Sequence, residues 1–272
     1  MMPAMENQVR QRITTGFFPR GLLILAVLIV SALWMALTPD GLLGKADALG
    51  YAVCHRFPDH SFFIGSRQMP LCARCSGMYL GMLTSLMYLL RSGARTEFPP
   101  LKITLPLSLF FLTFGVDGVN SLLWDFPTGG GLYPPTNFLR LATGAGLGML
   151  VPMFLLPVFH QTLWLSPLEQ PVLENWRQVI PLMVLAALIA LGVYSEIEVI
   201  LLPLAVLSAL TVPVILSICY AVLWVIILHK ENQYASIKQA WTPLLAGFLT
   251  AMLQIGLIDL LRYQLTGTWA GF

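Results

Sequence analysis

The sequence VILLPLAVLSALTVPVILSICYAVLWVIIL fills residues 199–228 and contains no charged side chain. A straight α-helix of this length measures about 45 Å, whereas the hydrocarbon core of a bilayer is about 30 Å thick. The stretch therefore predicts a membrane-spanning helix that either bends at Pro203 and Pro213 or extends beyond the core.

The composition of the whole chain supports a membrane protein. Of the 272 residues, 57% are hydrophobic and 10% are charged, and the mean hydropathy is +0.77. Soluble domains carry roughly 25% charged residues and about 45–50% apolar ones. The net charge of +2, without any basic run, excludes nucleic acid as a partner.

Seven apolar stretches approach or exceed the roughly 20 residues that one crossing requires. They occupy residues 21–37, 71–90, 101–124, 137–159, 179–194, 199–228 and 243–263. We expect an all-α, polytopic transmembrane helical bundle of about seven spans, with residues 1–272 forming a single membrane domain. Residues 1–16 would be a polar N-terminal tail, and residues 38–70 a polar loop.

Glycine pairs at four-residue spacing mark two of the expected spans. Gly77 and Gly81 lie in the second span, and Gly144 and Gly148 lie in the fourth. Small residues at this spacing allow two helix backbones to approach closely within a membrane. We expect both pairs to form packing faces.

Lysine and arginine in the short connections predict the orientation, because these residues accumulate on the cytoplasmic side. With the N-terminus inside, nine lie in inner segments and three in outer loops. The nine are Arg10, Arg12, Arg20, Arg91, Arg95, Lys102, Arg177, Lys230 and Lys238, and the three are Lys45, Arg56 and Arg67. The N-terminus is therefore expected in the cytoplasm and the loop 38–70 outside.

Three of the four cysteines lie in or beside the expected loop 38–70. Cys72 and Cys75 are three residues apart at the start of a helix, and Cys54 precedes them by 18 residues. Thiolates and imidazole are ligands that suit zinc, which binds four of them tetrahedrally. We predict a zinc site of Cys54, Cys72 and Cys75, completed by His55, with His60 as the other candidate.

The same cysteines allow two other interpretations. A pair spaced as Cys72 and Cys75 are, at a helix N-terminus, has a lowered thiol pKa and is typical of thiol–disulfide oxidoreductases. Such an enzyme would use Cys54 as an exchanging or resolving thiol and pass electrons to quinone. A structural disulfide is the third interpretation. Cys219 lies alone within a span and is expected to be a packing residue.

Polar residues within the expected spans gather at one membrane face. Arg74, Asp117, Asn120 and Arg140 all fall near the outer ends, as do Asn137, Asp259 and Arg262. A charge at mid-bilayer costs about 2.5–3.5 kcal/mol on insertion scales, so such groups are usually paired inside the bundle. We expect Asp117 to pair with Arg140, and Asp259 with Arg262.

Residues 50–150 resemble an uncharacterised family of prokaryotic membrane proteins, the domain of unknown function twenty eighty-five. The matching residues are Cys54, Pro58, Ser61, Phe62, Pro70 to Cys75, Gly77, Tyr79, Asp117, Gly118, Asn137, Arg140, Thr143 and Gly144. The family usually has arginine where this chain has His60, which favours His55 as the fourth ligand. The resemblance implies a shared polar site and carries no known activity.

These observations lead to one functional hypothesis and two alternatives. The hypothesis is a zinc-dependent enzyme of a prokaryotic plasma membrane that acts on a lipid or another membrane-delivered substrate. Asp117 would accept a proton, and Arg74, Asn120 and Arg140 would bind the substrate, for which an anionic lipid headgroup or a small phosphate is suitable. The alternatives are the quinone-linked thiol oxidoreductase and a transporter.

Overall fold

The computed structural model describes residues 19–126 and 129–270, so the expected polar tail 1–16 lies outside the described residues. The fold is an all-α helical bundle, as predicted. Its long helices are α2 (Arg20–Leu37), α4 (Ala73–Leu89), α5 (Leu101–Asp125), α6 (Asn137–Leu163), α7 (Trp176–Tyr194), α8 (Glu198–Ile227) and α9 (Ile237–Thr266). Each corresponds to one of the seven expected spans.

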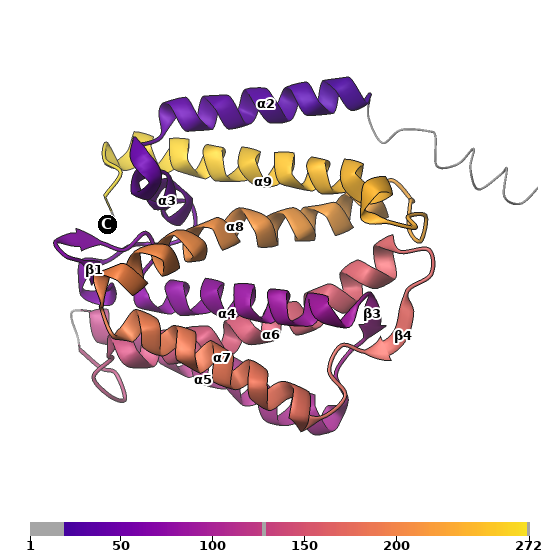
Figure 1. Cartoon of the computed structure of the whole chain (residues 1–272). Helices are drawn as coiled ribbons and strands as arrows, with labels where there is room; N and C mark the ends of the chain where they lie inside the picture. Colours follow the sequence, from indigo (N-terminus) through magenta and orange to yellow (C-terminus); the bar gives the residue numbers. More distant parts are fainter. Residues whose placement is uncertain (1–18, 127–128, 271–272) are drawn as a thin grey trace, which may run out of the picture.

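Six of these helices are long and apolar enough to cross a membrane, and the chain is a multi-pass membrane protein. The other long helix, α4, has 17 residues and lies inside the bundle, where most of its side chains are shielded by α6, α7 and α8. The long helices run side by side in alternating directions (Figure 1). The end that carries α3 and the start of α4 is called the cysteine end below.

Helices α4 and α6 form the most extensive helix contact of the bundle. A Cβ added at Gly77 would lie 2.3 Å from the carbonyl oxygen of Leu141, and one added at Gly144 would lie 2.1 Å from that of Arg74. Gly81 and Gly148 make equally close approaches to the facing backbone. The two glycine pairs therefore pack against each other, which confirms their prediction as packing faces.

The expected loop 38–70 is more structured than predicted. It contains helix α3 (Gly41–Tyr51), the 3-10 turn η1 (Pro58–His60) and the antiparallel strands β1 (Phe63–Ile64) and β2 (Arg67–Gln68). Glycines lower the helix propensity of 41–51, but Ala46 and Leu49 are buried in a cluster with residues of α8 and α9. Tertiary packing thus stabilises a helix that propensity alone does not predict.

The opposite end of the bundle is closed by short backbone pairings. Strand β3 (Arg95–Glu97) pairs in parallel with β4 (Leu168–Pro171), and the 3-10 turn η2 (Leu90–Ser92) leads into it. A single bridge joins Trp164 to Tyr234. These pairings connect the chain after α4 to the segments that follow α6 and α8.

Candidate metal centre at the cysteine end

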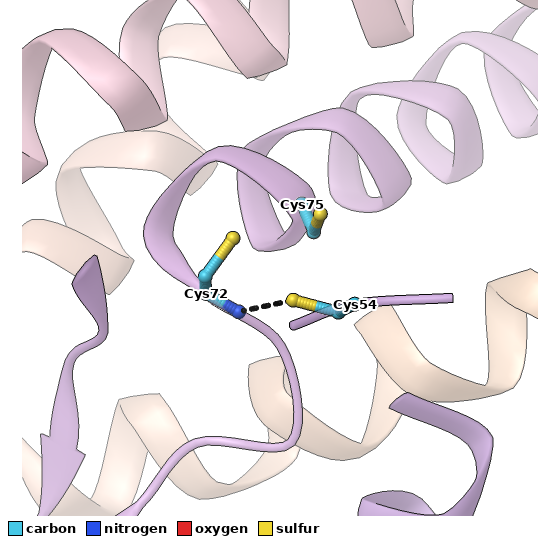
Figure 2. Close-up of side chains that lie close together, drawn as sticks. All are labelled: Cys54, Cys72 and Cys75. Atoms are coloured by element: carbon cyan, nitrogen blue, oxygen red, sulfur yellow. Dashed lines mark hydrogen bonds between the residues drawn. The ribbon is translucent and has the colours of Figure 1, made fainter. Parts of the chain in front are cut away.

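The three cysteines of the sequence motif converge at the start of α4. Cys72 is the N-cap residue of this helix, Cys75 lies in its first turn, and Cys54 follows α3. Their sulfur atoms all lie within 4.8 Å of one another (Figure 2). The backbone N–H of Cys72 donates a hydrogen bond of 3.3 Å to the sulfur of Cys54.

Close contact between Gly50 and Pro70 brings the two halves of this cluster together. A Cβ at Gly50 would lie 2.0 Å from the carbonyl oxygen of Pro70, two residues before Cys72. The N–H of Cys54 donates to the carbonyl of Gly50 at 2.9 Å, which fixes Cys54 relative to the end of α3. The absence of a side chain at residue 50 therefore sets the distance from Cys54 to Cys72.

The thiols differ in acidity because they bind one another. Hydrogen bonds from Cys54 and Cys75 hold the pKa of Cys72 well below its usual range, and the charge of Arg74 acts in the same direction. Bonding to Cys72, together with burial, raises the pKa of Cys54 to about 11. Of these two thiols, Cys72 is therefore the more acidic.

His55 lies outside the group of sulfur atoms that the structure brings together. Its ring is exposed and stacks on Phe57, with 5.9 Å between ring centroids. The ring of His60 is half-buried and reaches Asp125, with 3.5 Å between Nε2 and Oδ1. Burial lowers the pKa of His60, as does the charge of Arg140, while Asp125 and Cys72 oppose this effect. His60 is thus an electrostatic neighbour of the cluster.

Arg262 and Arg56 hold the segment that carries Cys54. Arg262, near the end of α9, donates to the carbonyls of Tyr51 and Cys54, the latter at 2.8 Å. Arg56 has a left-handed backbone (φ 57°) and is buried against Asp47, with 3.0 Å between Nη2 and Oδ1. The sequence analysis did not single out Asp47 as a partner of Arg56. The signal that could have indicated it is an acidic residue in a chain with few charged residues, nine positions before Arg56.

Asp117 binds Arg74 rather than the expected partner, Arg140. The ion pair joins Arg74 Nη2 to Asp117 Oδ2 at 2.5 Å, and Arg74 also donates to Ser121. The other carboxylate oxygen accepts a hydrogen bond of 3.0 Å from the hydroxyl of Tyr133. The length of the Arg74 side chain explains the difference, because it reaches Asp117 and Ser121 of α5 from the first turn of α4, whose backbone packs mainly on α6, α7 and α8.

Asn120 anchors the connection between α5 and α6. Its side-chain oxygen accepts from the N–H groups of Leu132 and Tyr133, at 2.6 and 3.2 Å, and its amide donates to the carbonyl of Tyr133 at 2.9 Å. All these partners are backbone groups of the segment that connects α5 to α6. Asn120 therefore positions this segment, and with it the hydroxyl of Tyr133 beside Asp117.

Arg140 is buried at the same end with few partners. Its Nη1 donates to Asn137 Oδ1 at 3.2 Å, and its buried Nε has no hydrogen-bond partner in the described part of the chain. Asp259, expected to pair with Arg262, instead accepts a hydrogen bond of 3.0 Å from the indole of Trp34. The expected gathering of polar residues at one end is therefore present, with different pairings.

The sequence of this chain matches those of known proteins. Residues 54–154 match the family described as "Predicted membrane protein (DUF2085)". An uncharacterized protein of Methanocaldococcus jannaschii, MJ1492, is 33% identical over 113 residues, which cover 41% of this chain and 67% of that protein. The chain belongs to this family. An uncharacterized protein of Methanothermobacter thermautotrophicus is 33% identical over 101 residues, covering 36% of this chain and 82% of the relative.

The segment that matches the family contains most of the site. It begins at Cys54 and includes both other cysteines together with the ion pair of Arg74 and Asp117. Helices α3 and α9, which hold the Cys54 segment, lie outside the match. No solved structure matches the chain.

Proposed function

We propose that Cys54, Cys72 and Cys75 hold a zinc ion at the extracytoplasmic face of a prokaryotic plasma membrane. The observation that carries the proposal is the convergence of three sulfur atoms within 4.8 Å. Zinc binds thiolate sulfur at about 2.3 Å in tetrahedral geometry, which places ligand sulfurs roughly 3.8 Å apart. Small side-chain rotations would bring the three sulfurs to that spacing.

The surroundings of the cluster suit three metal-bound thiolates. Three thiolates and one divalent cation leave a net negative charge, which nearby donors and cations stabilise. Arg74 lies between Cys72 and Cys75 on the first turn of α4, and the N–H of Cys72 already donates to the sulfur of Cys54. Sulfur ligands favour zinc over magnesium or calcium, which prefer oxygen.

A catalytic role is supported by the number of ligands. The described part of the chain contributes three ligand atoms to the cluster, and catalytic zinc sites commonly have three protein ligands. When bound, a zinc ion with an open position polarises substrate oxygens and lowers the pKa of water. We infer that the site acts on a substrate that the membrane delivers.

Arg140 is the side chain we assign to substrate binding. Its guanidinium is buried and retains an unbound Nε, so an anionic group such as a lipid phosphate would satisfy it. Arg74 is already engaged by Asp117, and both oxygens of that carboxylate are bound. We therefore assign Asp117 to positioning Arg74, in place of the proton-accepting role expected from the sequence.

Thiol–disulfide exchange is the second candidate function, and the acidity of Cys72 favours it. In this reaction the thiolate of Cys72 and the thiol of Cys75 would form a disulfide. The two electrons released, together with the proton of Cys75 and one proton from water, would reduce a membrane quinone to its quinol.

Metal analysis of purified protein, combined with a count of free thiols, distinguishes the two functions. We expect one zinc per chain in the wild type, and none after Cys54→Ser, Cys72→Ser or Cys75→Ser. The control is Cys219→Ser, because Cys219 lies in the middle of α8, far along the chain from the cluster. This variant should retain its zinc.

The opposite outcome is equally clear. Protein without zinc, in which two of the three clustered cysteines are oxidised, would overturn the metal site and support the redox function. A trapped mixed disulfide on Cys72→Ser or Cys75→Ser would then identify the exchanging thiol.

A further inference from the structure

A cavity of about 560 Å³ lies between α2 and α9, and none of the three clustered cysteines lines it. The two helices lie next to each other at one side of the bundle (Figure 1). Helix α2 is exposed along most of its length, with Leu23 as its only buried residue. The cavity walls include Leu33 and Leu253, both more than half exposed, so the cavity opens toward the hydrocarbon of the bilayer.

One carboxylate lies in the wall of this largely apolar space. Asp259 is 3% exposed, and its Oδ2 accepts a hydrogen bond from the indole N–H of Trp34. Its other oxygen, Oδ1, is buried and has no hydrogen-bond partner among the described residues. A buried carboxylate oxygen without a donor is costly, so the site favours a ligand that supplies positive charge or a donor.

Aromatic rings surround the same space. Trp34, Tyr263 and Trp269 line the cavity, and the rings of the last two lie 5.3 Å apart. Aromatic faces attract organic cations, and rings combined with a carboxylate form the usual recognition site for an ammonium group. The apolar remainder of the cavity suits a hydrocarbon tail.

No lysine, arginine or histidine of the described chain lines the cavity. The nearest basic residue on α9 is Arg262, one turn after Asp259, and its Nη1 donates to the carbonyls of Tyr51 and Cys54. Lys45 donates to backbone carbonyls at the end of α2, including that of Thr38 at 2.9 Å. Asp259 is therefore the one acidic residue among the described residues of the lining, and a cationic ligand would complement its carboxylate.

We propose that the cavity between α2 and α9 binds the ammonium headgroup of a membrane amphiphile, with Asp259 as its counter-ion. The amphiphile enters from the bilayer, its ammonium lies against Asp259 and the aromatic rings, and its tail follows the apolar face between the helices. This site is separate from the zinc site and does not depend on it.

The test measures saturable binding of radiolabelled dodecyltrimethylammonium to the full-length chain in maltoside micelles. Unlabelled dodecyltrimethylammonium should compete. At the same concentration, dodecyl sulfate should not compete because its headgroup is negative, and tetramethylammonium should not compete because it has no hydrocarbon tail. Asp259→Asn should weaken binding by at least about tenfold. Asp40→Asn removes an exposed carboxylate at the same end of the molecule and should leave the affinity unchanged.

A second variant covers the case in which Asp259→Asn does not fold. Gly256 lines the cavity, and a Cβ there would meet only Trp34 Cδ1 at an ordinary 3.8 Å, so Gly256→Leu should fold and fill the space. We expect it to abolish binding while the zinc content stays at the wild-type value. Equal competition by dodecyl sulfate, unchanged affinity in Asp259→Asn or Gly256→Leu, or an equal loss in Asp40→Asn would each overturn the proposal.

Discussion

The two ends of the bundle each contain an arginine–carboxylate pair, in very different surroundings. At the cysteine end, the side chain of Asp117 is 1% exposed where it meets Arg74. At the opposite end, the side chain of Glu174 is 44% exposed where it meets Arg95. The pair of Arg74 and Asp117 also bonds to Ser121 and Tyr133. In the pair at the opposite end, Arg95 also donates to the backbone carbonyl of Pro171 in β4.

This difference indicates what each end does. Polar groups buried within a membrane bundle are costly unless paired, and they usually mark functional sites. The cysteine end concentrates such groups around three thiols, while the opposite end closes the chain with strand pairing and an ion pair whose carboxylate, Glu174, is exposed to solvent. Substitutions at matched positions of the two ends should therefore change the free energy of unfolding by different amounts.

The largest effect is expected from the buried ion pair. Arg74→Met leaves Asp117 as an unpaired buried charge, which should lower the free energy of unfolding by about 3–5 kcal/mol. The equivalent change at the other end, Arg95→Met, should cost only about 0–1 kcal/mol, because Glu174 returns to solvent. Reversible unfolding in mild detergent measures both.

A second substitution tests whether pairing is the cause. Adding Asp117→Asn to Arg74→Met removes the stranded charge and should recover part of the lost stability. Equal losses in Arg74→Met and Arg95→Met would show that the two ends are energetically alike.

The next effect concerns the contact that brings the cysteines together. Gly50→Ala places a Cβ 2.0 Å from the Pro70 carbonyl, so the backbone must shift, at a cost of about 1–3 kcal/mol for overpacking. Separation of Cys54 from Cys72 should also lower the zinc content. Gly130→Ala adds a methyl group where no atom lies within 4 Å and serves as the control. Full zinc content in Gly50→Ala would show that this contact does not set the site.

Sequence reasoning succeeded where spacing along one helix is decisive. The glycine pairs of α4 and α6 and the seven long helices follow from local periodicity and are present, although only six of these helices, all but α4, are long and apolar enough to cross a membrane. The partner of Asp117 depends on how α4, α5 and α6 are placed against one another, which no single helix encodes. The role of Asn120 was missed for a related reason, because its partners are backbone groups of a following connection.

Asn120→Ala should lower the free energy of unfolding moderately, with structural effects confined to the segment between α5 and α6. The change leaves the N–H groups of Leu132 and Tyr133 without their acceptor, which costs about 1–3 kcal/mol when such groups stay buried. The exposed connection can rehydrate, so we expect the lower part of that range. Hydrogen exchange should accelerate at these two amides and remain unchanged at β3. Unchanged exchange at Leu132 would contradict the anchoring role.

The smallest effect on stability, and the most informative for function, is expected at Arg140. Unlike Arg74, Arg140 has no carboxylate within ion-pair distance among the described residues, and its Nε is buried without a partner. Arg140→Met removes a poorly compensated charge from a buried position, so stability should change by less than about 1 kcal/mol or rise slightly. Binding of a short-chain phosphatidic acid, measured by calorimetry in maltoside micelles, should weaken by at least about tenfold.

Two arginines at one end of the bundle would then have opposite tasks, since Arg74 stabilises the fold through Asp117 while Arg140 remains available to an anionic ligand. A loss of stability in Arg140→Met as large as in Arg74→Met, with lipid binding intact, would assign both residues to the fold.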